Sequence, residues 1–319
     1  MKNILITGAG GFIGSFLVEE ALSRGWNVWA GIRQTSSKEY LCDERISFID
    51  LHYSDKEILK QQIENFGNSY GKWDYIIHNA GITKCVNSDD FEKVNYHYTC
   101  KLIEALIETG TVPEKFILMS SISALPPIDT LYGESKRKAE EFLESQTDFP
   151  YLILRPTGVY GPRDKDYFLI LKSIKRGIEP TAGYSPQILT FIYVTDLVKA
   201  VFLATESTFS GKAYNISDGN SYSGETYTRI VKKVLGKKRI LKLKIPLIFL
   251  KTASIIMDFF SKLSKKPSTL NRDKYKIMKR RDWTCDITPL LQDFDFQAEY
   301  DLERGIAESV KWYKTHDWL

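Results

Sequence analysis

The chain has few cysteines, and their spacing matches no known kind of site. Only four of its 319 residues are cysteine, namely Cys42, Cys85, Cys100 and Cys285. None of their spacings is typical of a metal site or of a disulfide framework. We therefore expect free thiols in a reducing compartment. An apolar strand is predicted to begin at Ile4, which leaves no room for a signal peptide before it, so we expect a cytoplasmic protein.

The sequence also lacks repeats, low-complexity segments and an unbroken apolar run of membrane-spanning length. The most apolar stretch, residues 245–263, is interrupted by Pro246, Lys251 and Asp258, and is too broken to cross a bilayer. A hydrophobic content of 43% and a charged content of 26% are ordinary for a globular protein. At this length the chain can form one large domain, or a core with a smaller cap.

Acidic residues are scarce in one region of the chain. Residues 229–281 hold 18 of the 44 basic residues but only two of the 40 acidic ones, so this basic region has a balance of +16 and the rest of the chain −12. A solvated basic surface, an anionic substrate and an anionic membrane surface each explain such a region. Nucleic acid is disfavoured because no nucleic-acid-binding module accompanies the charge.

The most informative stretch is at the N-terminus, residues 4–15. A short apolar run leads into a turn with Gly8, Gly11 and Gly14, and an amphipathic run follows. Gly8 suits a backbone conformation closed to other residues, Gly11 allows close approach of a pyrophosphate, and Gly14 allows close packing of helix and strand. The helix start offers free N–H groups to that anion. An ordinary strand–turn–helix is the alternative.

This stretch resembles the T-G-x-x-G-x-x-G fingerprint of the short-chain dehydrogenase/reductase superfamily, in its extended branch, the NAD-dependent epimerase/dehydratase family. Residues 155–163, R-P-T-G-V-Y-G-P-R, resemble the R-P-x-x-V-Y-G-P loop of that branch. The resemblance covers roughly the first two-thirds of the chain. It implies a doubly wound parallel α/β sheet of the Rossmann type with a smaller C-terminal substrate-binding cap. We expect residues 1–155 and 188–216 in the core, and residues 156–187 and 217–319 in the cap.

Arg33 follows the second predicted strand, residues 26–32. In NAD-binding folds an acidic residue near this point hydrogen-bonds the ribose, whereas arginine suits a 2′-phosphate. Ile32 stands where NAD-preferring members of the family carry aspartate. Because a guanidinium can pair a phosphate through two bonds, the sequence favours NADP, with NAD as the alternative. A solvated surface arginine is the plainer explanation.

Tyr132 and Lys136 are four residues apart and therefore lie on one face of the predicted helix. A phenol titrates near pH ~10, and we expect the neighbouring ammonium to favour the phenolate. Tyr132 would then exchange a proton with a substrate oxygen during hydride transfer. Without the preceding glycine turn and serine-tipped strand, the pair would be read as a surface contact.

The resemblance implies further site residues. It makes Ser121 the catalytic serine beside Tyr132 and Lys136, with Ser120 and Ser123 as alternatives. Asn95, His78 and Asp196 are given structural roles. The residues that it places at the cofactor are Gly8, Gly11, Phe12, Ile13, Gly14, Arg33, Asp50, Leu51, Asn79, Ala80, Gly81, Tyr132, Lys136, Pro156 and Val159.

The sequence thus predicts an NADP-dependent oxidoreductase acting on a secondary alcohol or ketone, most similar to the dihydroflavonol-reductase and 3β-hydroxysteroid-dehydrogenase members. A nucleotide-sugar epimerase with tightly bound NAD would use the same residues. A non-catalytic cofactor sensor is disfavoured by the tyrosine–lysine pair. No Asp-Glu pair follows Ser121, which disfavours dehydration. We expect no metal, a small-molecule substrate that is anionic if the basic region binds it, a homodimer, and membrane contact at most at the surface.

Overall fold

A computed structural model describes residues 1–319 except Pro267 and Thr269, which fall within the predicted basic region. The chain divides into two compact units. The first comprises Met1–Thr83, Asn87–Arg155 and Val198–Tyr214, and the second comprises Lys84–Val86, Pro156–Leu197 and Asn215–Leu319. Each unit has its own hydrophobic core.

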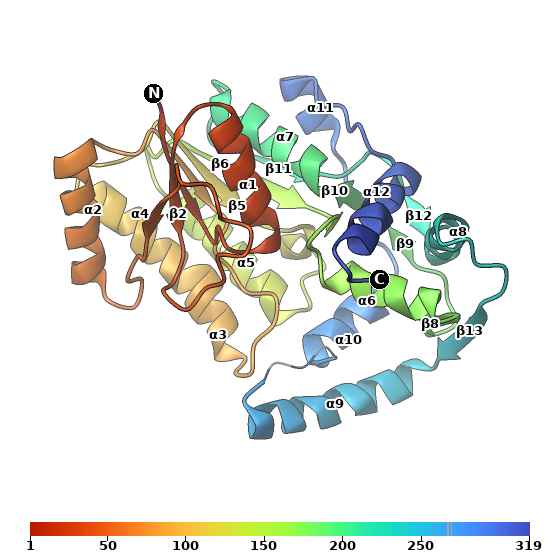
Figure 1. Ribbon diagram of the computed structural model, residues 1–319. Coiled ribbons are helices and arrows are strands. Elements are labelled where there is room, and N and C mark those ends of the chain that lie inside the picture. Colours follow the sequence, from red (N-terminus) through yellow and green to blue (C-terminus); the bar gives the residue numbers. More distant parts are fainter. Residues whose placement is uncertain (267, 269) are drawn as a thin grey trace. The chain divides into compact units, whose positions relative to one another are not determined.

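The first unit is built on a seven-stranded sheet with the order β11-β6-β5-β4-β1-β2-β3. Neighbouring strands pair in parallel from β6 across to β3, as predicted for a doubly wound fold (Figure 1). The strand order reverses between β1 and β4, the position where such folds bind ligands. The strands are β1 (Asn3–Thr7), β2 (Asn27–Gly31), β3 (Ser47–Ile49), β4 (Tyr75–His78), β5 (Lys115–Met119), β6 (Tyr151–Pro156) and β11 (Lys212–Ile216).

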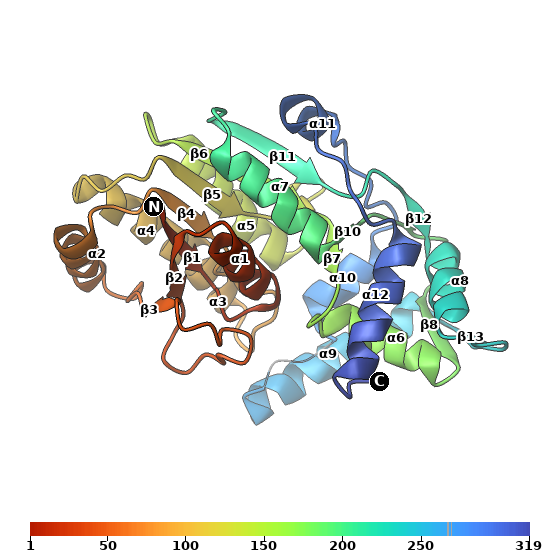
Figure 2. The same cartoon turned by 45° about the horizontal axis from the view of Figure 1, so that its top comes forward.

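Helices cover both faces of this sheet. Apolar residues of α2, α4 and α5 form one core cluster with the strands, because each helix presents an apolar stripe at helical spacing. Figure 2 shows α1 and α7 together on the other face, where Arg24 after α1 pairs with Glu206 of α7. The helical elements here are α1 (Phe12–Ser23), α2 (Lys56–Tyr70), α3 (Asp89–Phe91), a π-helix (Glu92–His97), α4 (Tyr98–Glu108), a 3-10 helix (Ile122–Ala124), α5 (Leu131–Glu144) and α7 (Val194–Glu206).

The second unit contains three two-stranded pairs, β10–β7, β12–β9 and β13–β8, with helices around them. Its core is rich in aromatic rings, and the ring of Tyr160 lies directly against Gly305, where a side chain would collide with it. The elements are β7 (Gly158–Tyr160), α6 (Asp166–Lys175), β8 (Ile178–Ala182), β9 (Ile188–Leu189), β10 (Phe191–Tyr193), β12 (Tyr222–Ser223), α8 (Gly224–Val234), β13 (Leu241–Ile245), α9 (Leu247–Ser264), α10 (Arg272–Lys279), α11 (Thr288–Phe294) and α12 (Leu302–Thr315).

Helix α9 leaves most of its apolar residues exposed. Helical spacing separates Lys251 and Asp258 from six apolar residues, which either a core contact or a membrane surface could bury, namely Leu247, Ile248, Leu250, Ile255, Ile256 and Phe259. Of these, only Leu250 is fully buried, whereas Ile248, Ile255, Ile256 and Phe259 are between 42% and 67% exposed. The reason is that the helix turns its serine-bearing side inward, with Ser254 and Ser261 buried. Among the helices that the structure describes, none has the length and apolarity to cross a membrane.

Candidate active site

The glycine turn between β1 and α1 is closely packed. Gly8 has a φ of +65°, which L side chains rarely adopt, and a Cβ on it would lie 2.9 Å from the Cα of Ala80. A Cβ on Gly14 would collide with the carbonyl oxygen of Gly8. These two positions therefore admit only glycine in the present backbone. The turn brings the start of α1 against the ends of β1 and β4.

Helix α1 begins without a side-chain cap. Its N-cap residue is Gly11, and its first turn begins with Phe12 and Ile13. No side chain caps this turn, and no acidic residue lies in it. In α2, by contrast, the Asp55 carboxylate accepts the N–H groups of Glu57 and Ile58. The first turn of α1 thus keeps its donors and the positive end of its dipole for an external anion. This arrangement fits the pyrophosphate of a dinucleotide.

The loop after β4 joins this turn to the predicted catalytic residues. The Ala80 N–H donates to Thr7 Oγ1 at 3.0 Å, and Asn79 Nδ2 lies 3.5 Å from the Gly8 carbonyl oxygen. A Cβ on Gly81 would lie 3.2 Å from Lys136 Nζ. The loop therefore brings together residues that are far apart in the sequence. Its own side chains are small and leave its backbone accessible.

Ser121 and Tyr132 lie side by side. Their side chains are hydrogen-bonded, and Ser121 Oγ also accepts the Ser123 N–H at 3.1 Å. Ser120, one of the alternatives, is buried and hydrogen-bonded to Glu140 instead. Of these serines, Ser121 is therefore the one that the structure joins to the tyrosine.

The electrostatics of Tyr132 differ from the expectation. The sequence predicted that Lys136 would lower the pKa of the phenol, but burial raises that pKa, and only the Ser121 hydrogen bond acts in the opposite direction. The difference arises because desolvation disfavours the phenolate, an effect that helical spacing does not reveal. The chain by itself therefore keeps Tyr132 protonated at neutral pH.

Lys136 is buried and held in place by the backbone. Its Nζ donates to the carbonyl oxygen of Met119, at the end of β5, at 2.8 Å. Burial lowers the pKa of Lys136 to about 8, while the charge of Glu140 acts to raise it. Near neutral pH this ammonium is thus close to its titration range, in contrast to an ordinary surface lysine.

Glu140 is a residue that the sequence analysis missed. It is fully buried, and it accepts Arg155 Nε at 2.9 Å, an Arg155 terminal nitrogen at 2.7 Å and an Arg137 nitrogen at 3.2 Å, besides the Ser120 hydroxyl. The spacing offered a signal, because Glu140 follows Lys136 by four residues and so lies one helical turn further along the same face. It links α5 to the ends of β5 and β6.

Asn95 and His78 fill polar positions behind the site. Asn95 lies in the π-helix, and its amide bonds both backbone groups of Ile82 and the hydroxyl of Ser135. His78 is buried between the hydroxyls of Thr7 and Thr99, each 3.0 Å from a ring nitrogen, and burial lowers its pKa to about 3. Its contacts agree with the structural role assigned to it. The π-turn that aims Asn95 cannot be recognised from helical periodicity in the sequence.

Arg33 is exposed in the loop after β2. The next residue, Gln34, donates its N–H to the Asp50 carboxylate at 3.0 Å, and Asp50 itself follows β3. Leu51 is buried beside it. Asp50 therefore ties down the segment that carries Arg33, and leaves the guanidinium accessible to a ligand.

Pro156 and Val159 belong to the second unit. Pro156 ends β6, and Val159 lies in β7 opposite Ile192 of β10. In the same unit the buried Asp196 carboxylate accepts the N–H groups of Glu299 and Tyr300 at 3.1 and 2.9 Å. Asp196 lies in the first turn of α7, and through these two bonds it secures the segment before α12.

Comparison with known proteins identifies the family. The model of the NAD-dependent epimerase/dehydratase family matches residues 4–217, more than half of the chain. The chain belongs to this family. The predicted resemblance is thus confirmed, and the protein is an NAD(P)-dependent enzyme of the extended short-chain dehydrogenase type.

Relatives and solved structures agree with this assignment. A ceramide reductase of Caulobacter vibrioides is 26% identical over 99% of this chain and 96% of its own. The human sterol-4-alpha-carboxylate 3-dehydrogenase, decarboxylating, is 27% identical over 68% of this chain and 62% of its own. The UDP-glucose 4-epimerase of Thermotoga maritima has the same fold, with a TM-score of 0.77 at 22% identity over 98% of this chain and 99% of its own.

Proposed function

We propose that the protein is an NADP-dependent reductase that converts a ketone into a secondary alcohol. The observation that carries this proposal is the hydrogen-bonded pair of Ser121 and Tyr132 next to the buried Lys136. The three come from the end of β5 and the first turns of α5, which are rigid elements. The glycine turn and the uncapped start of α1 lie in the same unit and suit the dinucleotide.

In the reductive direction Tyr132 would act as the proton donor. A phenol that stays protonated at neutral pH can donate its proton to a carbonyl oxygen as negative charge develops there. Ser121 would hold that oxygen in position, and Lys136 would stabilise the phenolate left behind. A bound reduced nicotinamide supplies the hydride.

Replacement of single side chains tests this assignment. Tyr132→Phe removes the proton donor and little volume, so turnover should fall by at least ~100-fold while NADP binding stays within about twofold. Lys136→Ala should weaken both. Tyr75→Phe, at the far end of β4, is the matched control and should leave both unchanged. Near-normal turnover by Tyr132→Phe would refute the mechanism.

The cofactor preference rests on Arg33. Loss of a charge-assisted fork should weaken NADP binding by roughly 10- to 100-fold and leave NAD binding nearly unchanged. We would titrate both cofactors against wild type, Arg33→Ala and the control Lys38→Ala, since Lys38 is an exposed cation of the same loop whose ammonium lies over the ring of Phe48. Wild-type protein that binds NAD as tightly as NADP contradicts the assignment.

The substrate proposal follows from one of the relatives that align over nearly the whole chain, the ceramide reductase. We would assay ketone-bearing sphingolipid precursors of ceramide type first, with NADPH consumption as the readout. Mass spectrometry of small molecules that purify with the protein provides an independent check. Tightly retained NAD without net turnover would point to a nucleotide-sugar epimerase instead.

The cellular compartment and the oligomeric state are part of the same proposal. All four cysteines, Cys42, Cys85, Cys100 and Cys285, are free thiols, which suits the cytoplasm. We propose a homodimer as the oligomer, to be measured by light scattering coupled to size exclusion.

A further inference from the structure

Helix α9 of the second unit exposes an apolar face along its whole length. At 3.6 residues per turn the exposed apolar residues fall on one side of the helix, with Thr252 among them, and so form one stripe. Phe259 is 67% exposed and Leu263 is 73% exposed, values far above those of core residues. The stripe consists of Ile248, Phe249, Ile255, Ile256, Phe259, Phe260 and Leu263.

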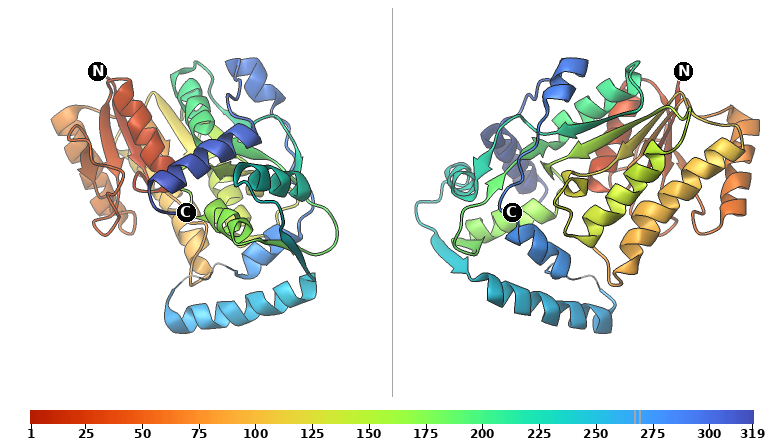
Figure 3. Two further views of the ribbon diagram at one scale, coloured as in Figure 1. Left: turned by 45° about the vertical axis from the view of Figure 1, so that its right-hand side comes forward. Right: turned by 180° about the vertical axis from the view of Figure 1, so that it is seen from behind.

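The opposite side of α9 faces the protein and is partly polar. Ser254 is fully buried, and Ser261 donates to the carbonyl oxygen of Lys266 at 2.6 Å. Asp258 accepts the Arg272 N–H at 3.3 Å and pairs with its guanidinium at 3.6 Å. Through these contacts α10 packs beside α9, as both panels of Figure 3 show. The buried side of α9 therefore carries two serines, whereas its phenylalanines are exposed.

Lysines border the apolar stripe. Lys251 and Lys262 are exposed and eleven residues apart, which places them about three turns apart on one edge of the helix. Exposed Lys265 and Lys266 follow the last turn. All four belong to the basic region of residues 229–281, in which only Asp258 and Asp273 are acidic.

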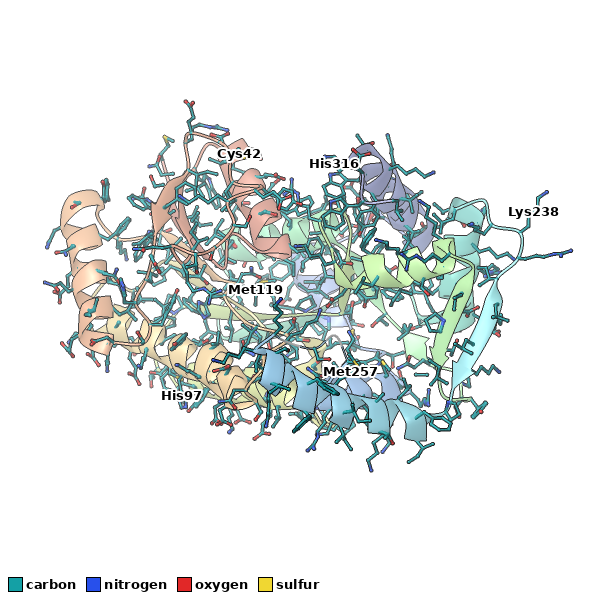
Figure 4. The ribbon with its side chains drawn as sticks, turned by 60° about the horizontal axis from the view of Figure 1, so that its bottom comes forward. Cys42, His97, Met119, Lys238, Met257 and His316 are labelled. Carbon is teal, nitrogen blue, oxygen red and sulfur yellow. The ribbon has the colours of Figure 1, made fainter. Side chains whose placement is uncertain are left out.

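Within the basic region itself negative charge is scarce, although Lys233 and Lys242 pair with Glu303 and Glu225 from outside it. Asp258 is engaged with Arg272, and Asp273 is buried at the start of α10. The turn between α8 and β13 adds Lys238, which Figure 4 shows pointing away from the ribbon, while Met257 marks α9 in the same view. An apolar stripe edged by cations is thus the dominant property of this surface.

We propose that α9 docks the protein onto an anionic lipid bilayer, lying in the plane of the membrane surface. Helices of this kind bury their apolar face at the headgroup boundary and set their lysines among anionic headgroups. A second copy of the chain fits less well, because a two-fold interface would bring the stripe and its lysines against the same lysines. This docking goes beyond the proposed reaction and needs no catalytic step.

Vesicle co-sedimentation tests the proposal on the full-length protein. The probes are vesicles of phosphatidylglycerol mixed with phosphatidylcholine, and vesicles of phosphatidylcholine alone. We expect binding to the anionic vesicles at low salt, and weaker binding at high salt because screening shortens the reach of the lysines to ~3 Å at 1 M. Absence of binding to anionic vesicles at low salt overturns the proposal.

Two sets of variants separate the apolar and charged contributions. Ile256→Ser combined with Phe259→Ser and Leu263→Ser should weaken vesicle binding at least ~10-fold. The control replaces Ile58, Ile107 and Leu291 by serine, since these are 41% to 44% exposed on other helices, and should bind like wild type. Equal losses of vesicle binding in the α9 serine variant and in its control would overturn the role of α9.

The charge set replaces Lys251, Lys262 and Lys265 by glutamine and should weaken binding to anionic vesicles by roughly 10- to 100-fold at low salt. Its control replaces Lys93, Lys311 and Lys314, which are exposed outside the basic region. Circular dichroism and NADP affinity verify that each variant is folded. If the serine set instead converts a dimer into a monomer and wild type ignores vesicles, a second copy covers the stripe and the membrane proposal is wrong.

Discussion

The buried carboxylate of Glu140 gives the sharpest test of how the catalytic helix is held. Glu140→Ala would remove the acceptor for Arg155, whose side chain is only 12% exposed, and for the buried Ser120 hydroxyl. Arg137 would lose less, because it is 32% exposed and also pairs with Glu141 and Glu144. The variant thus leaves one cation with few replacement partners.

The expected cost follows from that burial. Breaking one partner out of a buried ion pair costs about 3–5 kcal/mol, because the remaining charge stays desolvated. For a chain of 319 residues each kcal/mol lowers Tm by roughly 1.5 °C, so a fall of roughly 4–8 °C is expected. The Tm of Glu140→Gln should lie between those of wild type and Glu140→Ala, since an amide oxygen still accepts one hydrogen bond.

Urea and thermal unfolding of wild type, Glu140→Ala and Glu141→Ala measure this cost. Glu141 is the matched control, because it is 57% exposed and pairs with the same Arg137 at 2.9 Å. Such an exposed pair contributes about 0–1 kcal/mol. If the two alanine variants lose equal stability, Glu140 does not hold α5 as described. Combining Glu140→Leu with Arg155→Met should recover part of the loss, because no unpaired buried charge remains.

Two further predictions concern buried polar groups. Burial lowers the pKa of His78 from its ordinary 6.5 to about 3, so between these pH values the unfolded chain binds a proton that the native state excludes. The free energy of unfolding should therefore be at its full value above pH 6.5 and fall as the pH drops toward 3. The expected slope is up to ~1.4 kcal/mol per pH unit. His78→Gln should flatten that slope in urea unfolding and the exposed His316→Gln should not, and an unchanged slope in His78→Gln would contradict the assignment. Asp196→Ala should cost about 2–4 kcal/mol of unfolding free energy through the two lost N–H acceptors while NADP affinity stays within about twofold, and the reverse pattern would indicate a role at the cofactor.

Local signals in the sequence were enough to predict most of the first unit. The strands Tyr75–His78 and Lys115–Met119 are each a short apolar run closed by small or polar residues, and this pattern is typical of buried strands. The glycine turn was predictable for a similar reason. Close backbone packing leaves glycine as the only residue that fits, so the requirement is visible in the residue type itself.

Properties that depend on burial were not predictable. Helical spacing places Tyr132 and Lys136 on one face, but it carries no information about how much water reaches the phenol. That solvation decides the direction of the pKa shift. Glu140 was missed for the same reason, since an isolated glutamate on a helix is ordinarily solvated. Its role depends on Arg155, which arrives from β6 fifteen residues later.

Helix α9 shows why its orientation could not be derived from its pattern. The rule that polar residues mark the outer side of a helix assumes that water lies outside. On that rule Asp258 joins Lys251 on the solvent side, and Lys251 is exposed there, whereas Asp258 pairs with Arg272 of α10. The side with Ser254 and Ser261 packs inward. The stripe with Phe259 then faces outward. In water this orientation costs free energy, because apolar surface stays exposed. A lipid surface removes that cost, so the orientation of α9 is the one expected of a helix whose outer neighbour is a bilayer.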